Sequence, residues 1–129
     1  MSDHPANAAR GEHELKLGKT CYVLRPSYAA ISAAEAKTGH SLMALLRLAD
    51  ASDLSLAHLG VVVAELIRAG AGKGDDLTAG VNAERIAELI FEEGMPHVMA
   101  RVTICLLDAA SGGRTATGEM KPVAEMAIS

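Results

Sequence analysis

The chain has 129 residues, half of them hydrophobic, and a formal net charge of −4 at pH 7. This length fits one domain. Because Tyr22, Tyr28 and Phe91 are the only aromatic residues, the core must be aliphatic, which favours close-packed helices over a β-sandwich. The acidic balance argues against a nucleic-acid binder, because neutralising phosphates requires clustered Lys and Arg.

The N-terminal segment and the cysteines indicate a cytoplasmic compartment. Residues 1–10 are polar and Ala-rich and lack the apolar stretch of a secretory signal, so they are predicted to form a disordered tail. No apolar run approaches the roughly 20 residues that span a membrane, so no membrane partner is expected. Cys21 and Cys105 are expected to be buried thiols and not a disulfide.

Residues 12–25 are predicted to form a β-hairpin. Leu15 and Leu17 alternate with charged residues at the period of a half-buried strand. Gly18 and Lys19 supply a tight turn, since glycine adopts a positive φ at little cost. The apolar return strand ends before a proline, which cannot donate a hydrogen bond to the sheet.

Five helices are predicted after the hairpin, each opened by a residue typical of a helix start. Their starts are marked by Ser27, Ser41, Ser55, Asn82 and Pro96. The pattern dissolves after the last of them, and 111–129 is predicted to be a disordered tail. The predicted fold is α+β, mainly α: an N-terminal β-hairpin followed by about five helices in a compact bundle, forming a single domain over residues 11–110.

The chemistry-bearing residues do not form a recognisable active site. None of the five histidines pairs with another His or Cys at metal-ligand spacing. The glycine-rich run 70–74 is not a phosphate loop, because Ile67 stands where that motif needs Gly and Gly74 where it needs Ser or Thr. This run is predicted to be a flexible loop, followed by Asp75 and Asp76 as a loop pair or a helix cap. We expect no catalytic residue, no metal and no cofactor.

Two features suggest protein binding as an alternative to packing within the chain, which is the first explanation for both. A lone hairpin is marginal in water, so it must pack on the helices or gain a partner strand. The first helix is rich in alanine and leaves a smooth surface that permits close helix approach. Tyr and Arg are enriched at binding hot spots. The candidate protein-binding residues are Tyr22, Leu24, Arg25 and Tyr28.

The order of these elements carries a family resemblance. The hairpin ends in Leu24-Arg25-Pro26-Ser27-Tyr28, the segment Glu35 through Leu42 follows, and the helix over 56–72 ends in Gly-Ala-Gly. Over roughly residues 11–107 the chain resembles the small tail protein encoded by phage-like gene transfer agents and related prophages of α-proteobacteria. The family has been described both as tail-tube-like and as a tail assembly chaperone.

The resemblance implies the chaperone function more readily, since a tube subunit would be richer in β-strand. Such a chaperone is non-enzymatic and coats the long helical tape-measure protein so that the tail tube can polymerise around it. Self-association into a homo-oligomer is left open. The first alternative is a structural subunit of the tail tube or tail terminator, found in the virion. The second is a small ligand-binding domain or enzyme whose site is assembled from His58, His97 and Glu65.

Overall fold

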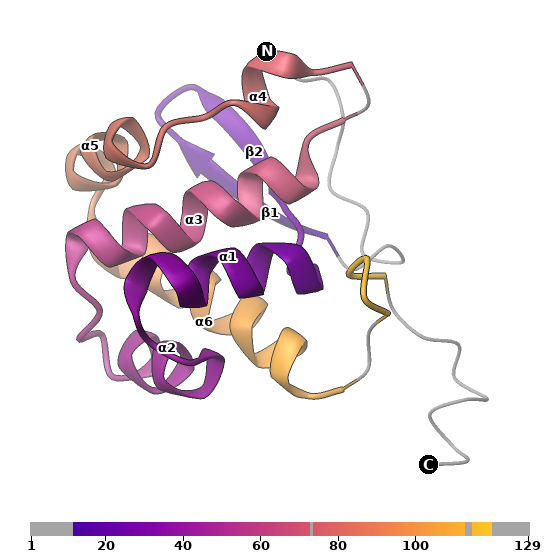
Figure 1. The fold of residues 1–129 in the computed structure, drawn as a ribbon. Helices are drawn as coiled ribbons and strands as arrows, with labels where there is room; N and C mark the ends of the chain where they lie inside the picture. Colours follow the sequence, from indigo (N-terminus) through magenta and orange to yellow (C-terminus); the bar gives the residue numbers. More distant parts are fainter. Residues whose placement is uncertain (1–11, 73, 113–114, 120–129) are drawn as a thin grey trace.

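The computed structural model describes residues 12–72, 74–112 and 115–119. Within them, a two-stranded antiparallel sheet precedes six helices (Figure 1), which confirms the predicted α+β, mainly α fold. The predicted tail 1–10 and residues 120–129 of the second predicted tail lie outside the described residues. The elements are β1 (His13–Leu17), β2 (Thr20–Leu24), α1 (Tyr28–Thr38), α2 (Leu42–Asp50), α3 (Leu56–Gly70), α4 (Asp76–Ala79), α5 (Ala83–Glu93) and α6 (Met95–Ala110).

The hairpin forms as the alternating pattern predicts. β1 and β2 pair from His13 opposite Leu24 to Leu17 opposite Thr20, which leaves Gly18 and Lys19 as a two-residue turn. Gly18 has φ of +62°, the left-handed conformation that the first position of such a turn favours. The inward-facing leucines of β1 are buried, whereas the charged residues between them are exposed.

The helix starts follow the predicted caps. The Oγ atoms of Ser27, Ser41 and Ser55 each accept a hydrogen bond from a backbone N–H in the first turn of the helix, and Asn82 does the same for α5. Pro96 lies in the first turn of α6, where its missing N–H has no intrahelical acceptor.

Helix α4 follows the predicted loop 70–74 and is not among the five predicted helices. Its single turn is too short to show a helical period in the sequence, but Asp75 caps it by accepting a hydrogen bond from the Thr78 backbone N–H at 3.2 Å. Hydrogen bonding by the side chain and backbone of Thr78 lowers the pKa of the Asp75 carboxyl. The prediction of a cap at this position is confirmed.

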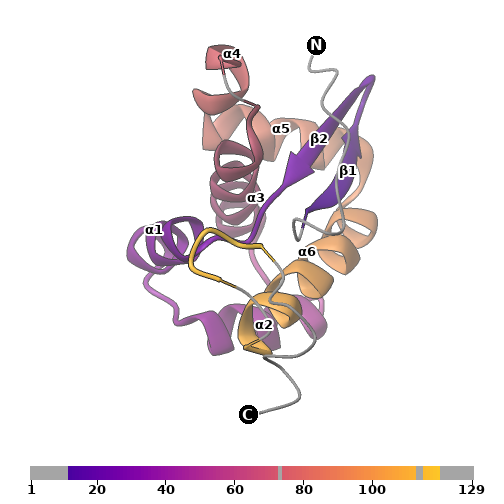
Figure 2. The same ribbon diagram turned by 90° about the vertical axis from the view of Figure 1, so that its right-hand side faces the viewer.

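Helix α3 is the centre of the fold. Figures 1 and 2 show it between α1 on one side and the hairpin on the other, and it also packs against α5. Most of its residues are buried, including Leu59, Val63 and Ile67. Neighbours can pack on several sides of α3 because this helix is apolar around most of its circumference.

Two glycines of α3 allow the closest approaches. A Cβ on Gly60 would lie 2.8 Å from the Ala87 Cβ of α5, and a Cβ on Gly70 would lie 2.2 Å from the Val23 carbonyl oxygen of β2. The backbone of β2 therefore rests directly on the end of α3. The Arg25 N–H also donates to the Leu66 carbonyl oxygen at 3.0 Å, which fixes the hairpin to α3 just past β2.

One prediction about the cysteines is corrected. Cys105 is buried in α6 as expected, but Cys21 is exposed. It lies opposite Lys16 in the hairpin. Val23 shares its face of β2 and is buried where the strand meets Gly70 at the end of α3, whereas Cys21 lies nearer the turn, beyond this contact. No helix in the described part of the chain combines the length and the apolar character needed to cross a membrane.

We expect Gly70→Ala to lower the free energy of unfolding by at least about 2 kcal/mol, because the added methyl group meets backbone that must move. Chemical denaturation followed by circular dichroism measures this. The matched control is Ala57→Ser on the exposed side of the same helix, which should change stability by less than about 0.5 kcal/mol. Equal stabilities of the two variants would contradict the close approach.

Candidate protein-binding surface

The structure separates the four predicted binding residues. Leu24 is fully buried, so its side chain is removed from the candidate surface. Tyr22 is half-buried and faces hollows that α4 and α5 border. Tyr28 is 72% exposed at the start of α1. Arg25 lies near it, at the end of a groove between α1 and α3.

This alanine groove has a volume of about 550 Å³. Alanines supply half of its lining: three from α1, one from α3, and Ala116. Polar side chains stand at its ends and along one side. The lining residues are Arg25, Ser27, Ala29, Ala30, Ala33, Glu65, Arg68, Ala69, Ala116 and Thr117. The predicted smooth surface of the first helix thus forms one wall. The opposite wall comes from Glu65, Arg68 and Ala69 of α3, which no sequence pattern places beside the first helix.

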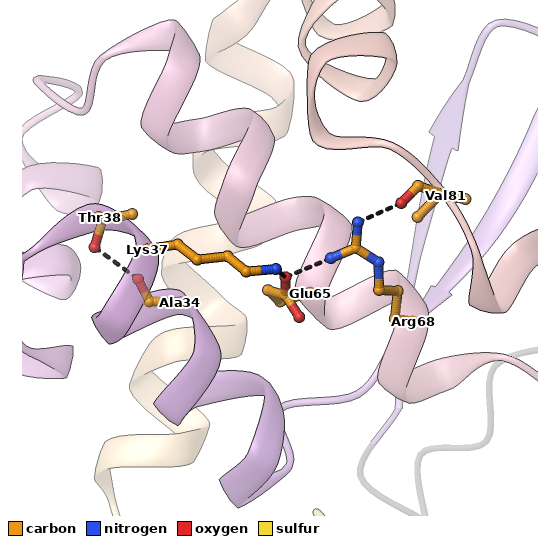
Figure 3. Close-up of polar contacts among 6 residues, drawn as sticks. All are labelled: Ala34, Lys37, Thr38, Glu65, Arg68 and Val81. Atoms are coloured by element: carbon orange, nitrogen blue, oxygen red, sulfur yellow. Dashed lines mark hydrogen bonds and ion pairs between the residues drawn. The ribbon is translucent and has the colours of Figure 1, made fainter.

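A buried carboxylate bridges the two walls of the groove. Glu65 of α3 is only 8% exposed, and its Oε2 lies 2.5 Å from the Lys37 Nζ of α1. The same oxygen accepts from Arg68 one turn along α3, and Arg68 also donates to the Val81 carbonyl oxygen before α5 (Figure 3). A buried carboxylate needs such partners, since an unpaired charge would be strongly destabilising. The network therefore ties α1, α3 and the approach to α5 together beside the groove.

The far end of the groove is formed by the step from β2 into α1. The Arg25 Nη2 donates to the buried Glu12 Oε2 at 2.6 Å. The Arg25 Nε is buried and has no hydrogen-bond acceptor within the described residues. Because this donor is buried, it is an unsatisfied group within the described part of the fold and not one that the groove presents to a partner.

Part of the predicted C-terminal tail lies at this end of the groove. The Tyr28 N–H donates to the Ala116 carbonyl oxygen at 2.8 Å, and Gly118 packs against Arg25 and Ser27 with φ of +96°. Within 111–129, residues 115–119 thus form a turn against the start of α1 (Figure 2). Ala116 lines both the alanine groove and a neighbouring hollow that Tyr28 borders.

The residues suggested for a small catalytic or ligand site do not converge. The His58 ring packs edge-on against His40 with centroids 5.2 Å apart, whereas His97 is exposed on α6 and Glu65 is held by its two cations. The contact between His40 and His58 has no signal in the sequence, since His40 lies in the connection between α1 and α2 and His58 lies in α3. Among the described residues, no group of three His, Cys, Asp or Glu side chains is placed to hold a metal ion.

No protein-family model matches the chain, and searches of curated proteins and of solved structures found no similar protein. Membership of the tail-protein family therefore stays a prediction.

We expect Glu65→Gln to lower the free energy of unfolding by about 1–2 kcal/mol, because it keeps the side-chain shape and removes the charge shared by Lys37 and Arg68. Denaturant titration measures the loss. Glu88→Gln is the control, since Glu88 pairs with Arg85 on the exposed face of α5, where an ion pair contributes little. A Glu65→Gln variant as stable as the control would show that the network is not structural.

Proposed function

We propose that this chain is a non-enzymatic tail assembly chaperone that binds the helical tape-measure protein, and that a helix of that protein docks in the alanine groove. The observation that carries the proposal is the groove itself, an open hollow walled by the small side chains of two helices. The resemblance of residues 11–107 to gene transfer agent tail proteins supplies the identity of the partner.

The shape of the groove suits a helix. Helices pack with axes roughly 8–10 Å apart, and small side chains at the contact permit the lower end of this range. Ala29 is exposed and Ala33 is half-buried, so the groove wall presents methyl groups to a partner without large side chains that must first move. An amphipathic helix can therefore lay its apolar stripe into the groove, as in other helix-in-groove complexes.

Polar groups around the groove would fix the position of the partner helix. Arg68 lines the groove and its side chain is 30% exposed. A Glu or Gln of the partner helix that reaches this guanidinium would pair with it, which favours one register over others. Tyr28, exposed beside the groove, offers the aromatic area that often anchors such interfaces.

The test is co-expression with the long tail protein encoded in the same gene cluster, scored by the solubility of that protein and its co-purification with this chain. We expect both with the wild-type chain. Ala29→Gln should weaken binding by about tenfold or more, because the longer side chain fills the groove. The control, Ala36→Gln, changes an exposed residue of the same helix that does not line the groove, and should bind normally.

Three outcomes would contradict the proposal in different ways. A tape-measure protein that stays soluble alone needs no chaperone of this kind. Equal binding by both glutamine variants would place the contact outside the groove. Many copies of the chain in purified particles would favour the structural-subunit alternative, since a chaperone leaves before the tail is complete.

A further inference from the structure

The outer edge of β1, meaning the backbone of residues 13–17 on the side away from β2, is the basis of a second inference. Figure 2 shows β2 between α3 and β1, so β1 is the outer strand. Glu14 and Lys16 are exposed, and within residues 12–72, 74–112 and 115–119 neither makes a hydrogen bond outside the hairpin. An open strand edge of this kind is a template for pairing with another chain.

The hairpin register determines which backbone groups point outward. In a hairpin with a two-residue turn, the pair flanking the turn is hydrogen-bonded, and hydrogen-bonded pairs then alternate with non-hydrogen-bonded ones. Leu17 and Thr20 flank the turn here, so Leu15 and His13 also direct their N–H and C=O groups toward β2. The N–H and C=O groups of Glu14 and Lys16 therefore point to the open side.

The charges on these two residues select one partner. When β1 pairs antiparallel with β1 of a second copy about a twofold axis at Leu15, Glu14 lies opposite Lys16 of the second copy, and Lys16 opposite its Glu14. The outward backbone groups meet in this same register. A twofold axis centred on Glu14 or on Lys16 would instead place like charges opposite each other, which is destabilising.

We propose that the chain forms a symmetric dimer through β1, in which the two hairpins make a four-stranded antiparallel sheet. Lysine on an edge strand usually discourages pairing. Here Glu14 lies two residues from Lys16, so each lysine pairs with a glutamate of the second copy. Other registers place like charges opposite each other and are disfavoured. This inference does not depend on the proposed tail function.

The assembly closes at two copies because the other edge of the hairpin is covered. Gly70 of α3 rests on the Val23 carbonyl oxygen, and the Arg25 N–H is bound to Leu66 of the same helix. The far strand of each hairpin therefore has no room for a further strand over this stretch. A pairing that uses the same patch on both partners and leaves no free edge gives a closed dimer and not a filament.

Sedimentation analysis of the full chain from micromolar to millimolar concentration tests the proposal. We expect a reversible monomer–dimer equilibrium. Glu14→Lys and Lys16→Glu should each weaken dimerisation by about tenfold or more, since either one places like charges opposite each other at both pairs. The double variant E14K/K16E restores opposite charges and should dimerise like the wild type. Hydrogen exchange at the Glu14 and Lys16 amides should slow as the dimer forms.

Glu88→Lys is the matched control, because it makes the same charge change on the exposed face of α5 and should leave dimerisation unaltered. A wild-type chain that remains monomeric throughout would overturn the proposal. So would single variants that dimerise normally, a double variant that fails to recover, or assemblies larger than a dimer.

Discussion

The close packing of α3 against three neighbours is the constraint on which the rest of the structure depends. At Gly60 and at Gly70 the backbone of α3 meets another element with no room for a Cβ. These contacts bring α5 and β2 to opposite ends of one helix and leave its middle for α1, where Glu65 is buried. The alanine groove exists because α1 approaches α3 along one side only, with small residues at the remaining gap.

The local structure could be predicted from the sequence, because its signals lie within a few residues of each other. Side-chain caps such as Ser27 and the turn glycine Gly18 act on the adjacent backbone, and the structure forms there as expected. The burial of Leu24 and the exposure of Cys21 could not be predicted in the same way. Both depend on where the helices meet β2: α3 covers the end of the strand that carries Val23 and Leu24 and does not extend to Cys21, and nothing in the run 21–24 marks that limit.

Only part of the alanine groove could be predicted from the sequence, because its other residues come together through tertiary packing. Arg25 and Tyr28 stand out as residue types, but the wall of the groove opposite them comes from α3 and from the turn 115–119. Glu65 reads as a solvent-facing residue off the apolar stripe of its helix. Its burial follows from the position of α1, whose Lys37 arrives from a distant part of the chain to share the carboxylate.

The two proposed surfaces lie on opposite sides of α3, with the alanine groove toward α1 and the open edge at β1 (Figure 2). Neither would obstruct the other. A dimer joined through β1 would present two copies of the groove, and a long helical partner could then occupy both in one complex. Binding at the second groove would be intramolecular, so the pair would hold such a partner more tightly than either groove alone.

The pairing of α2 with α6 has a consequence for the order of events during synthesis. α2 is complete at Asp50 and packs on α6, which is complete only at Ala110. Translation adds roughly 5–20 residues per second. Leu45 and Ala49 of α2 therefore stay exposed for several seconds, on the order of the time needed to synthesise the chain from α2 to the end of α6. The hairpin, α1 and α3 can assemble in that interval. The apolar face of α2 is therefore the last part of the core to be buried, and until then it can contact other nascent chains.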